Sequence, residues 1–140
     1  QKARMVAKIR EALGGSEADK EIAVLGLTFK PETDDMREAP ALAILPALAD
    51  KGAVIRAHDP EGMREARKLL PESISFADSI ESAVRDADAV VLMTEWNQYR
   101  GLDLTALRKA MRGDVFVDLR NVYERELMER AGLRYTSVGR

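Results

Sequence analysis

Short, mainly apolar runs recur along the chain, and they predict the strands of a single sheet. The runs fall at residues 22–25, 53–57, 74–76, 89–93 and 115–117, with a sixth candidate at 135–138. Because these runs do not alternate steadily with polar residues, we expect strands that are buried on both faces.

Helical patterns separate the apolar runs, at residues 41–49, 63–70, 80–84, 104–111 and 124–131. Regular alternation of strands and helices indicates crossover connections between parallel strands. The sequence therefore predicts the α/β class: a doubly wound, Rossmann-like parallel sheet of five to six strands with helices on both faces. Pro40 suits the first turn of the first of these helices, whereas Pro46 predicts a kink or a late start.

An amphipathic helical pattern precedes the first run. Met5, Val6, Ile9, Ala12 and Leu13 share one face, and Gly14-Gly15-Ser16 ends the helix. The chain begins inside this pattern, at Gln1 and without a methionine, so we expect a piece of a longer protein. In this interpretation residues 1–15 form a linker helix and residues 20–140 form one α/β domain.

Composition excludes several classes of function. The 22 Lys and Arg balance 24 Asp and Glu, and a net charge of −2 provides no broad field for nucleic acid or an anionic membrane. With no cysteine and a single histidine, disulfides, a cysteine nucleophile and a zinc site of His and Cys are excluded from this chain. No apolar run is long enough for a bilayer and no signal peptide pattern occurs, so we expect a soluble, cytoplasmic protein.

Polar side chains follow four of the predicted strands, at the edge where open parallel sheets bind their ligands. They are Thr28, Lys30, Asp34, Asp35 and Arg37, then His58-Asp59-Pro60, Thr94-Glu95-Trp96-Asn97 and Asp118-Leu119-Arg120-Asn121. Lys30, Arg37 and Arg120 would form an anion site there. The alternative is that these cations pair with Asp34, Asp35, Glu38 and Asp118, and spacing alone favours this alternative.

The remaining candidates have structural interpretations beside functional ones. Asp59 stands where nucleotide-binding domains keep an acid for ribose, but an Asp-Pro turn capping the next helix is favoured. His58, without a visible partner, and Trp96 are expected to be structural, although Glu95 and Trp96 could frame a sugar or a base. Asp34 and Asp35 lack a third carboxylate, so we expect no metal site. The first loop lacks GxGxxG, which argues against a main dinucleotide site.

Four segments carry a resemblance to a known family. In order, they are "IAVLGLTFKPETDDMREAP", "HDPEGM", "ADAVVLMTEWNQYRGLDL" and "VFVDLRNVY". Together they resemble the C-terminal, UDP-binding domain of the UDP-glucose 6-dehydrogenases, in the UDP-glucose/GDP-mannose dehydrogenase family. The resemblance covers nearly the whole chain. Residues 1–13 are similar to the segment that leads into this domain from the family's central helical region. Of the motifs, "GLTFKPETDDMR" is specific, whereas the strand patterns are not.

The resemblance implies an NAD-dependent oxidoreductase that oxidises UDP-glucose to UDP-glucuronate through a covalent intermediate on a cysteine. It implies an N-terminal domain that binds most of the NAD, a central helix that forms a homodimer, and a catalytic cysteine outside this chain, which would then be inactive alone. Phe29 and Lys30 match the family's substrate-binding pair, and Arg37 matches an arginine that reaches NAD. Arg120 matches a substrate-binding arginine, although Leu119 replaces the glycine that often precedes it.

Two alternatives remain open beside UDP-glucose oxidation. The parent enzyme could act on GDP-mannose or UDP-N-acetylmannosamine, since "TEW" and "DLRN" favour UDP-glucose only by similarity. The chain could also be a free-standing nucleotide-binding module without catalysis.

Overall fold

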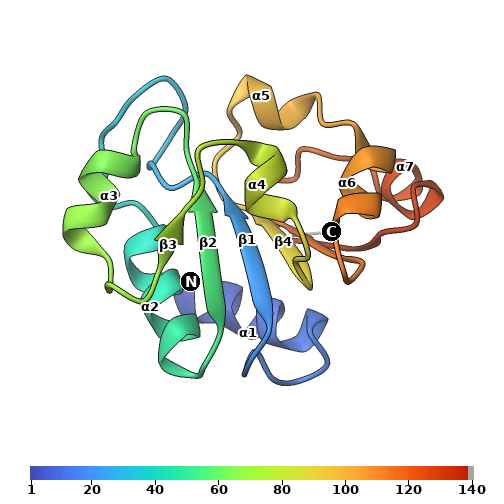
Figure 1. Cartoon of the computed structure of the whole chain (residues 1–140), viewed down its shortest axis with the longest axis horizontal. Helices are drawn as coiled ribbons and strands as arrows, with labels where there is room; N and C mark the ends of the chain where they lie inside the picture. Colours follow the sequence, from blue (N-terminus) through green and yellow to red (C-terminus); the bar gives the residue numbers. More distant parts are fainter. Residues whose placement is uncertain (139–140) are drawn as a thin grey trace.

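A six-stranded parallel sheet forms the centre of the computed structural model, which describes residues 1–138 (Figure 1). The strands are β1 (Glu21–Leu25), β2 (Val54–His58), β3 (Ser75–Phe76), β4 (Ala89–Leu92), β5 (Val115–Asp118) and β6 (Arg134–Ser137). Every predicted run therefore overlaps a strand, with bounds that differ by at most one residue at each end, and the sixth candidate is one of them. Residues 139 and 140 of the predicted domain lie outside the described part of the chain.

The strand order is β3-β2-β1-β4-β5-β6, and all neighbouring pairs are parallel. This is the order of a doubly wound Rossmann sheet, and it confirms the predicted fold class. The chain moves outward from β1 in one direction as far as β3, then returns to the middle of the sheet at β4. The topological switch point thus lies between β1 and β4.

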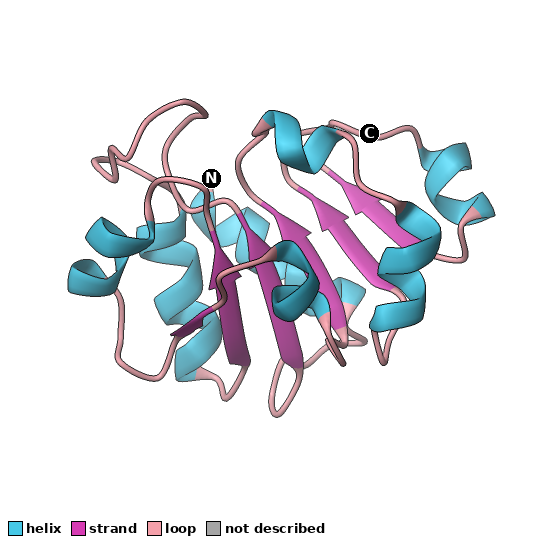
Figure 2. Cartoon of the chain, turned by 45° about the horizontal axis from the view of Figure 1, so that its top comes forward, coloured by secondary structure: helices cyan, strands magenta, loops and turns pink. Residues whose placement is uncertain are grey.

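Helices cover both faces of the sheet (Figure 2). One face packs against α1 (Lys2–Ala12), α2 (Ala41–Asp50) and α3 (Met63–Leu69), and the other against α4 (Ile80–Val84), α5 (Asn97–Arg100), α6 (Leu104–Ala110) and α7 (Arg125–Arg130). Alternate residues of each strand feed the two cores: Val24 and Val91 face the first, while Leu25 and Leu92 face the second. Double burial explains why the central strands β1, β4 and β5 appear in the sequence as largely apolar runs.

Helix α1 packs on the sheet with the rest of the first face. Val6 and Ile9 are buried in the same core as Leu45 and Val117. Because α2 and α3 lie over the β1, β2 and β3 half of that face, α1 supplies cover for the side of β5 that they leave open. The pattern that predicted a linker helix is therefore the pattern of a helix with a buried face.

Two details differ from the sequence-based expectations. A kink or a late start was expected from Pro46; helix α2 begins at Ala41, directly after Pro40, and continues through Pro46, so the late start does not occur. A short helix, α5, follows Trp96 in a segment expected to be a loop. Among residues 1–138, no helix has the length and apolar character needed to cross a membrane.

Candidate functional site

The register of the sheet aligns the carboxyl ends of its four central strands. Leu25 is paired with His58 on one side and with Leu92 on the other, and Leu92 is paired with Asp118. The loops after β1, β2, β4 and β5 consequently leave the sheet at one edge, toward which the arrowheads in Figure 2 point. The four polar segments singled out in the sequence are brought to a single rim.

The loop after β1 is held at its root by the buried carboxylate of Asp59. Asp59 Oδ2 accepts hydrogen bonds from the N–H of Leu27 at 2.7 Å and of Thr28 at 3.1 Å. Asp59 Oδ1 accepts from the N–H of Glu61 at 2.9 Å and of Gly62 at 2.8 Å, immediately before α3. The predicted Asp-Pro turn is present, but Asp59 does not cap α3 as expected, because the N-cap of this helix is Gly62 and no side chain caps it. The same carboxylate also fixes a second loop.

A second buried contact joins the loops on either side of the switch point. Thr94 Oγ1 donates to the Thr28 carbonyl at 2.7 Å, so the β4 loop is tied to the β1 loop. Gly26 permits this closeness: its φ is +99°, and a Cβ there would lie 2.5 Å from the Thr94 Cβ. The single glycine of this loop thus serves close packing against β4.

Phe29 and Lys30 follow this anchored segment and are exposed. The Phe29 ring is 48% exposed, although it is a large apolar side chain. Lys30 makes no ion pair within 4 Å in the described part of the chain, and its charge acts on the nearby Asp35 carboxylate. An anchored backbone with an outward ring and a free ammonium can receive an anionic ligand.

Arg37 is paired within its own loop. Its Nε and Nη2 donate to Asp35 Oδ1 and Oδ2, each at 3.0 Å, and the Arg37 side chain is 88% exposed. Hydrogen bonds from Arg37 hold the pKa of Asp35 below its ordinary value, with a further contribution from Lys30. For this arginine, the predicted pairing with a neighbouring carboxylate is confirmed.

Arg120 has a different partner from those proposed from the sequence. Its Nη2 donates to Glu95 Oε2 at 3.1 Å, so the predicted pairing with Asp118 is wrong. The buried Asp118 carboxylate is already occupied, because it accepts from the backbone N–H of Arg120 and Val122 and from the Tyr135 hydroxyl. Leu119, between Asp118 and Arg120, is buried in the core.

Glu95 and Trp96 both contain a buried polar atom without a hydrogen-bond partner in residues 1–138: Glu95 Oε1 and Trp96 Nε1. Burial raises the pKa of Glu95, but hydrogen bonding from Arg120 and the charges of Arg120 and Arg100 outweigh it, so the net pKa is lowered. Glu95 is therefore ionised at neutral pH. Trp96 is 4% exposed and packs in the second core, which confirms its predicted structural role.

His58 does have a partner, Tyr99 of α5, which the sequence gave no signal to identify. The Tyr99 hydroxyl donates to the His58 carbonyl at 3.0 Å and lies 2.7 Å from His58 Nδ1. Nδ1–H is then the donor to the Tyr99 oxygen. Burial lowers the pKa of His58 despite the nearby Asp59 carboxylate, so the ring is neutral at pH 7 and structural.

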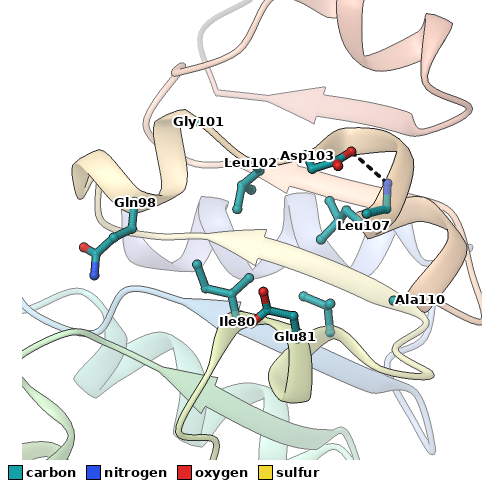
Figure 3. Close-up of a pocket in the computed structure, with 10 residues that line it drawn as sticks. Ile80, Glu81, Gln98, Gly101, Leu102, Asp103, Leu107 and Ala110 are labelled. Atoms are coloured by element: carbon teal, nitrogen blue, oxygen red, sulfur yellow. Dashed lines mark hydrogen bonds between the residues drawn. The ribbon is translucent and has the colours of Figure 1, made fainter.

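Two of the hollows in the surface differ in the charged side chains that line them, and this difference bears on which ligand each could bind. Arg37 and Asp35 line an open one of about 740 Å³ together with Leu42 of α2 and Leu69 of α3. The other, of about 250 Å³, lies between α4 and α6, and Figure 3 shows its apolar floor and the Glu81 and Asp103 carboxylates. No lysine or arginine lines it, so it does not suit a phosphate.

The rim does not fit the pyrophosphate of a dinucleotide in the usual way. A dinucleotide site needs glycines that let the backbone approach the phosphates, whereas Gly26 is closed off by Thr94. Among residues 1–138, the structure contains no group of three or more His, Asp or Glu side chains that could hold a metal ion. Charged side chains are what this rim offers to a ligand.

Comparison with known proteins places these observations in a family. Residues 23–125 match the profile of the UDP-glucose/GDP-mannose dehydrogenase family, UDP binding domain. The chain is 48% identical over 139 residues to UDP-glucose 6-dehydrogenase of Rhizobium meliloti (strain 1021), covering 99% of this chain and 32% of that protein.

Solved structures of longer relatives agree. A UDP-glucose dehydrogenase from Pyrobaculum islandicum superimposes with a TM-score of 0.77 at 32% identity, over 96% of this chain and 29% of that one. A UDP-D-ManNAc dehydrogenase from Pyrococcus horikoshii gives a TM-score of 0.81 at 27% identity, over 99% of this chain and 31% of that one. The chain thus spans about a third of the length of these relatives.

Proposed function

The chain belongs to the UDP-glucose/GDP-mannose dehydrogenase family, whose UDP-binding domain its residues match, and we propose that it binds the UDP moiety of a nucleotide sugar. In this proposal it is the C-terminal domain of an NAD-dependent UDP-glucose 6-dehydrogenase, an oxidoreductase that converts UDP-glucose to UDP-glucuronate. Most of the NAD binding belongs to the remainder of that enzyme, and so does the chemical step, because this chain contains no cysteine to serve as nucleophile.

One observation carries the proposal: Lys30 is an exposed cation without an ion-pair partner in the described chain, next to the switch point of the sheet. Ligands of open α/β sheets bind at that point. The backbone beside Lys30 is fixed by the hydrogen bond between Thr94 and Thr28, so the ammonium group extends from a rigid base.

Phe29 and Arg120 complete the proposed substrate site. The exposed Phe29 ring offers an apolar surface to the nucleoside, and the ammonium of Lys30 neutralises phosphate charge. Arg120 follows β5, two strands from β1 with β4 between them, and its planar guanidinium suits a phosphate oxygen pair. Residues from the loops after β1 and β5 would then hold the diphosphate across the carboxyl end of β4.

We assign Arg37 to NAD rather than to UDP. Its side chain is 88% exposed and lines the open hollow beside α2 and α3, while Arg120 stands on the β5 side of the rim. We propose that NAD lies mainly on an N-terminal domain and that Arg37 reaches it across the interface between the domains. The parent enzyme would be a homodimer in which the N-terminal and central domains complete the active site, and the fragment would be inactive alone.

The test is steady-state kinetics of the full-length enzyme with Lys30→Ala and Arg37→Ala. Lys30→Ala is expected to raise KM for UDP-glucose about tenfold or more, because a charged contact to phosphate is lost. Arg37→Ala is expected to raise KM for NAD and to leave that for UDP-glucose nearly unchanged. Lys51→Ala, an exposed lysine at the opposite edge of the sheet, is the matched control. An unchanged KM for UDP-glucose in Lys30→Ala would overturn the assignment.

A second candidate substrate is favoured by the likeness to the P. horikoshii enzyme, whose name specifies UDP-D-ManNAc. The site residues proposed here address the UDP moiety, which both nucleotide sugars share. Turnover of UDP-glucose, UDP-N-acetylmannosamine and GDP-mannose by the intact enzyme separates the candidates. We expect the highest kcat/KM with UDP-glucose.

A further inference from the structure

Glu95 is an acid at the centre of a rim that we have proposed to bind an anion. It follows β4, the strand between the loops that contain Lys30 and Arg120. A carboxylate in that place repels a diphosphate unless its charge is committed elsewhere. Its contacts therefore need a physical explanation.

The Glu95 carboxylate is committed to Arg120. Glu95 Oε2 accepts from Arg120 Nη2 at 3.1 Å, and the two side chains are only 25% and 30% exposed. Glu95 Oε1 is buried and has no hydrogen-bond partner in residues 1–138. Separation of Arg120 from Glu95 would leave a largely buried carboxylate without its cation, which is strongly unfavourable. Burial of the carboxylate therefore favours the ion pair over the separated side chains.

The backbones beneath both residues are also fixed. Thr94, directly before Glu95, donates to the Thr28 carbonyl at 2.7 Å. The Arg120 N–H donates to Asp118 Oδ1 at 3.0 Å, and Asp118 is fully buried at the end of β5. The carboxylate and the guanidinium therefore meet from two rigid supports, and the Arg120 side chain has little freedom to turn away.

We propose that Glu95 is a positioning residue that holds the guanidinium of Arg120 in the orientation that receives the diphosphate. This inference rests on the proposed UDP binding. A guanidinium has five N–H donors, and the hydrogen bond to Glu95 uses Nη2, so other donors remain for phosphate oxygens. Binding then finds Arg120 already ordered, without the entropy loss of fixing a long side chain.

The sign of the effect of neutralising Glu95 distinguishes positioning from simple charge. If Glu95 acted only as a nearby negative charge, Glu95→Gln would strengthen UDP binding by removing repulsion. If it positions Arg120, the same change weakens binding, because glutamine holds a guanidinium less strongly than a carboxylate does. The two accounts predict opposite outcomes.

The experiment is calorimetric titration of UDP into the full-length enzyme and its variants. We expect Glu95→Gln to weaken UDP binding about fivefold or more. Glu61→Gln removes an equal charge from an exposed acid on the same rim, and it should bind UDP as tightly as the wild type or slightly more tightly. Circular dichroism and thermal unfolding check that each variant is folded. Unchanged or tighter binding in Glu95→Gln overturns the inference.

A double-mutant cycle tests whether Glu95 acts through Arg120. In the Arg120→Ala background, Glu95→Gln should have no further weakening effect on UDP binding; an equal effect in both backgrounds overturns the positioning role. The ¹⁵N relaxation of the Arg120 Nε–H gives a readout without ligand, and we expect faster motion in Glu95→Gln. If the wild-type enzyme does not bind UDP, the proposed function is wrong, and this inference is wrong with it. If UDP binding is normal and depends on Lys30 but not on Glu95, only this inference is wrong.

Discussion

The Asp59 carboxylate supports two loops of the rim at once. It accepts hydrogen bonds from Leu27 and Thr28 after β1, and from Glu61 and Gly62 before α3. Its side chain is fully buried, so each of these N–H groups depends on it for a partner. The position of Lys30 therefore depends on an acid that does not itself contact the proposed ligand.

Asp59→Asn should lower the free energy of unfolding by about 2 to 3 kcal/mol, because the amide group faces N–H donors with its own N–H and leaves buried groups unpaired. Urea unfolding measures the change. Asp78→Asn, at an exposed acid, is the control and should change stability little. Equal stabilities of Asp59→Asn and the wild type would mean that these loops do not need the carboxylate.

At the scale of elements, α2 combines good packing with an unfavourable residue. Ile44, Leu45 and Leu48 are fully buried, yet Pro46 stands between them inside the helix. A proline lacks the N–H that would bond to the preceding turn. Burial of the apolar face thus holds a helix that local propensity disfavours, which is why the late start predicted from Pro46 does not occur.

Pro46→Ala should raise the free energy of unfolding by about 2 to 2.6 kcal/mol. An interior proline destabilises a helix by about 3 kcal/mol, and the gain from removing it is reduced by about 0.4 to 1 kcal/mol as the unfolded chain becomes freer. Chemical denaturation is again the measurement. Pro40→Ala provides the contrast: Pro40 has a φ of −56° at the start of the helix, so its loss should destabilise slightly. A lower stability of Pro46→Ala would contradict this explanation.

The central strands were predictable from the sequence because a strand that is buried on both faces has apolar residues at successive positions. All residues of β4 are buried, and the predicted run at 89–93 contains the whole strand. Helix α5 was not predicted, because a helix that spans only Asn97–Arg100 is too short for a periodic pattern to emerge.

In the candidate site, too, some contacts could be predicted from the sequence and others could not. The partner of Arg37 lies two residues away, at Asp35, and was among the carboxylates named from the sequence. The partner of Arg120 is 25 residues away, and only the alignment of β4 with β5 brings Glu95 beside it. The positions of the predicted strands indicated which residues lie in the loops that follow them. The choice between Asp118 and Glu95 as the partner of Arg120 required side-chain geometry.

At the scale of the whole molecule, α1 is joined to the sheet by packing and by charge. Ile9 is fully buried against the first core. Arg10 Nε and Nη2 donate to Glu17 Oε1 and Oε2, both at 2.7 Å, so the helix is clamped to the segment that leads into β1. Glu17 is 1% exposed, which makes this a buried carboxylate with one bidentate partner.

This clamp predicts how stability changes with pH. Hydrogen bonding from Arg10 lowers the pKa of Glu17 below its ordinary value of 4.5, against the opposing effect of burial. A carboxyl group with a lowered pKa in the folded state contributes stability above the unfolded pKa, and this contribution is lost as pH falls through the folded value. The wild type should therefore be more stable than Glu17→Gln at pH 7, and the difference should shrink below about pH 4.5.

Urea unfolding of both proteins between pH 7 and pH 3 measures that difference, and the comparison cancels the other carboxylates that titrate in the same range. Glu126→Gln removes an acid that is 85% exposed in its pair with Arg130, and its curve should run parallel to that of the wild type. Parallel curves for Glu17→Gln and the wild type would show that the Arg10 clamp adds no pH-dependent stability. If the two stability curves converge at low pH, the ionised Glu17 carboxylate stabilises the attachment of α1, and protonation removes this contribution.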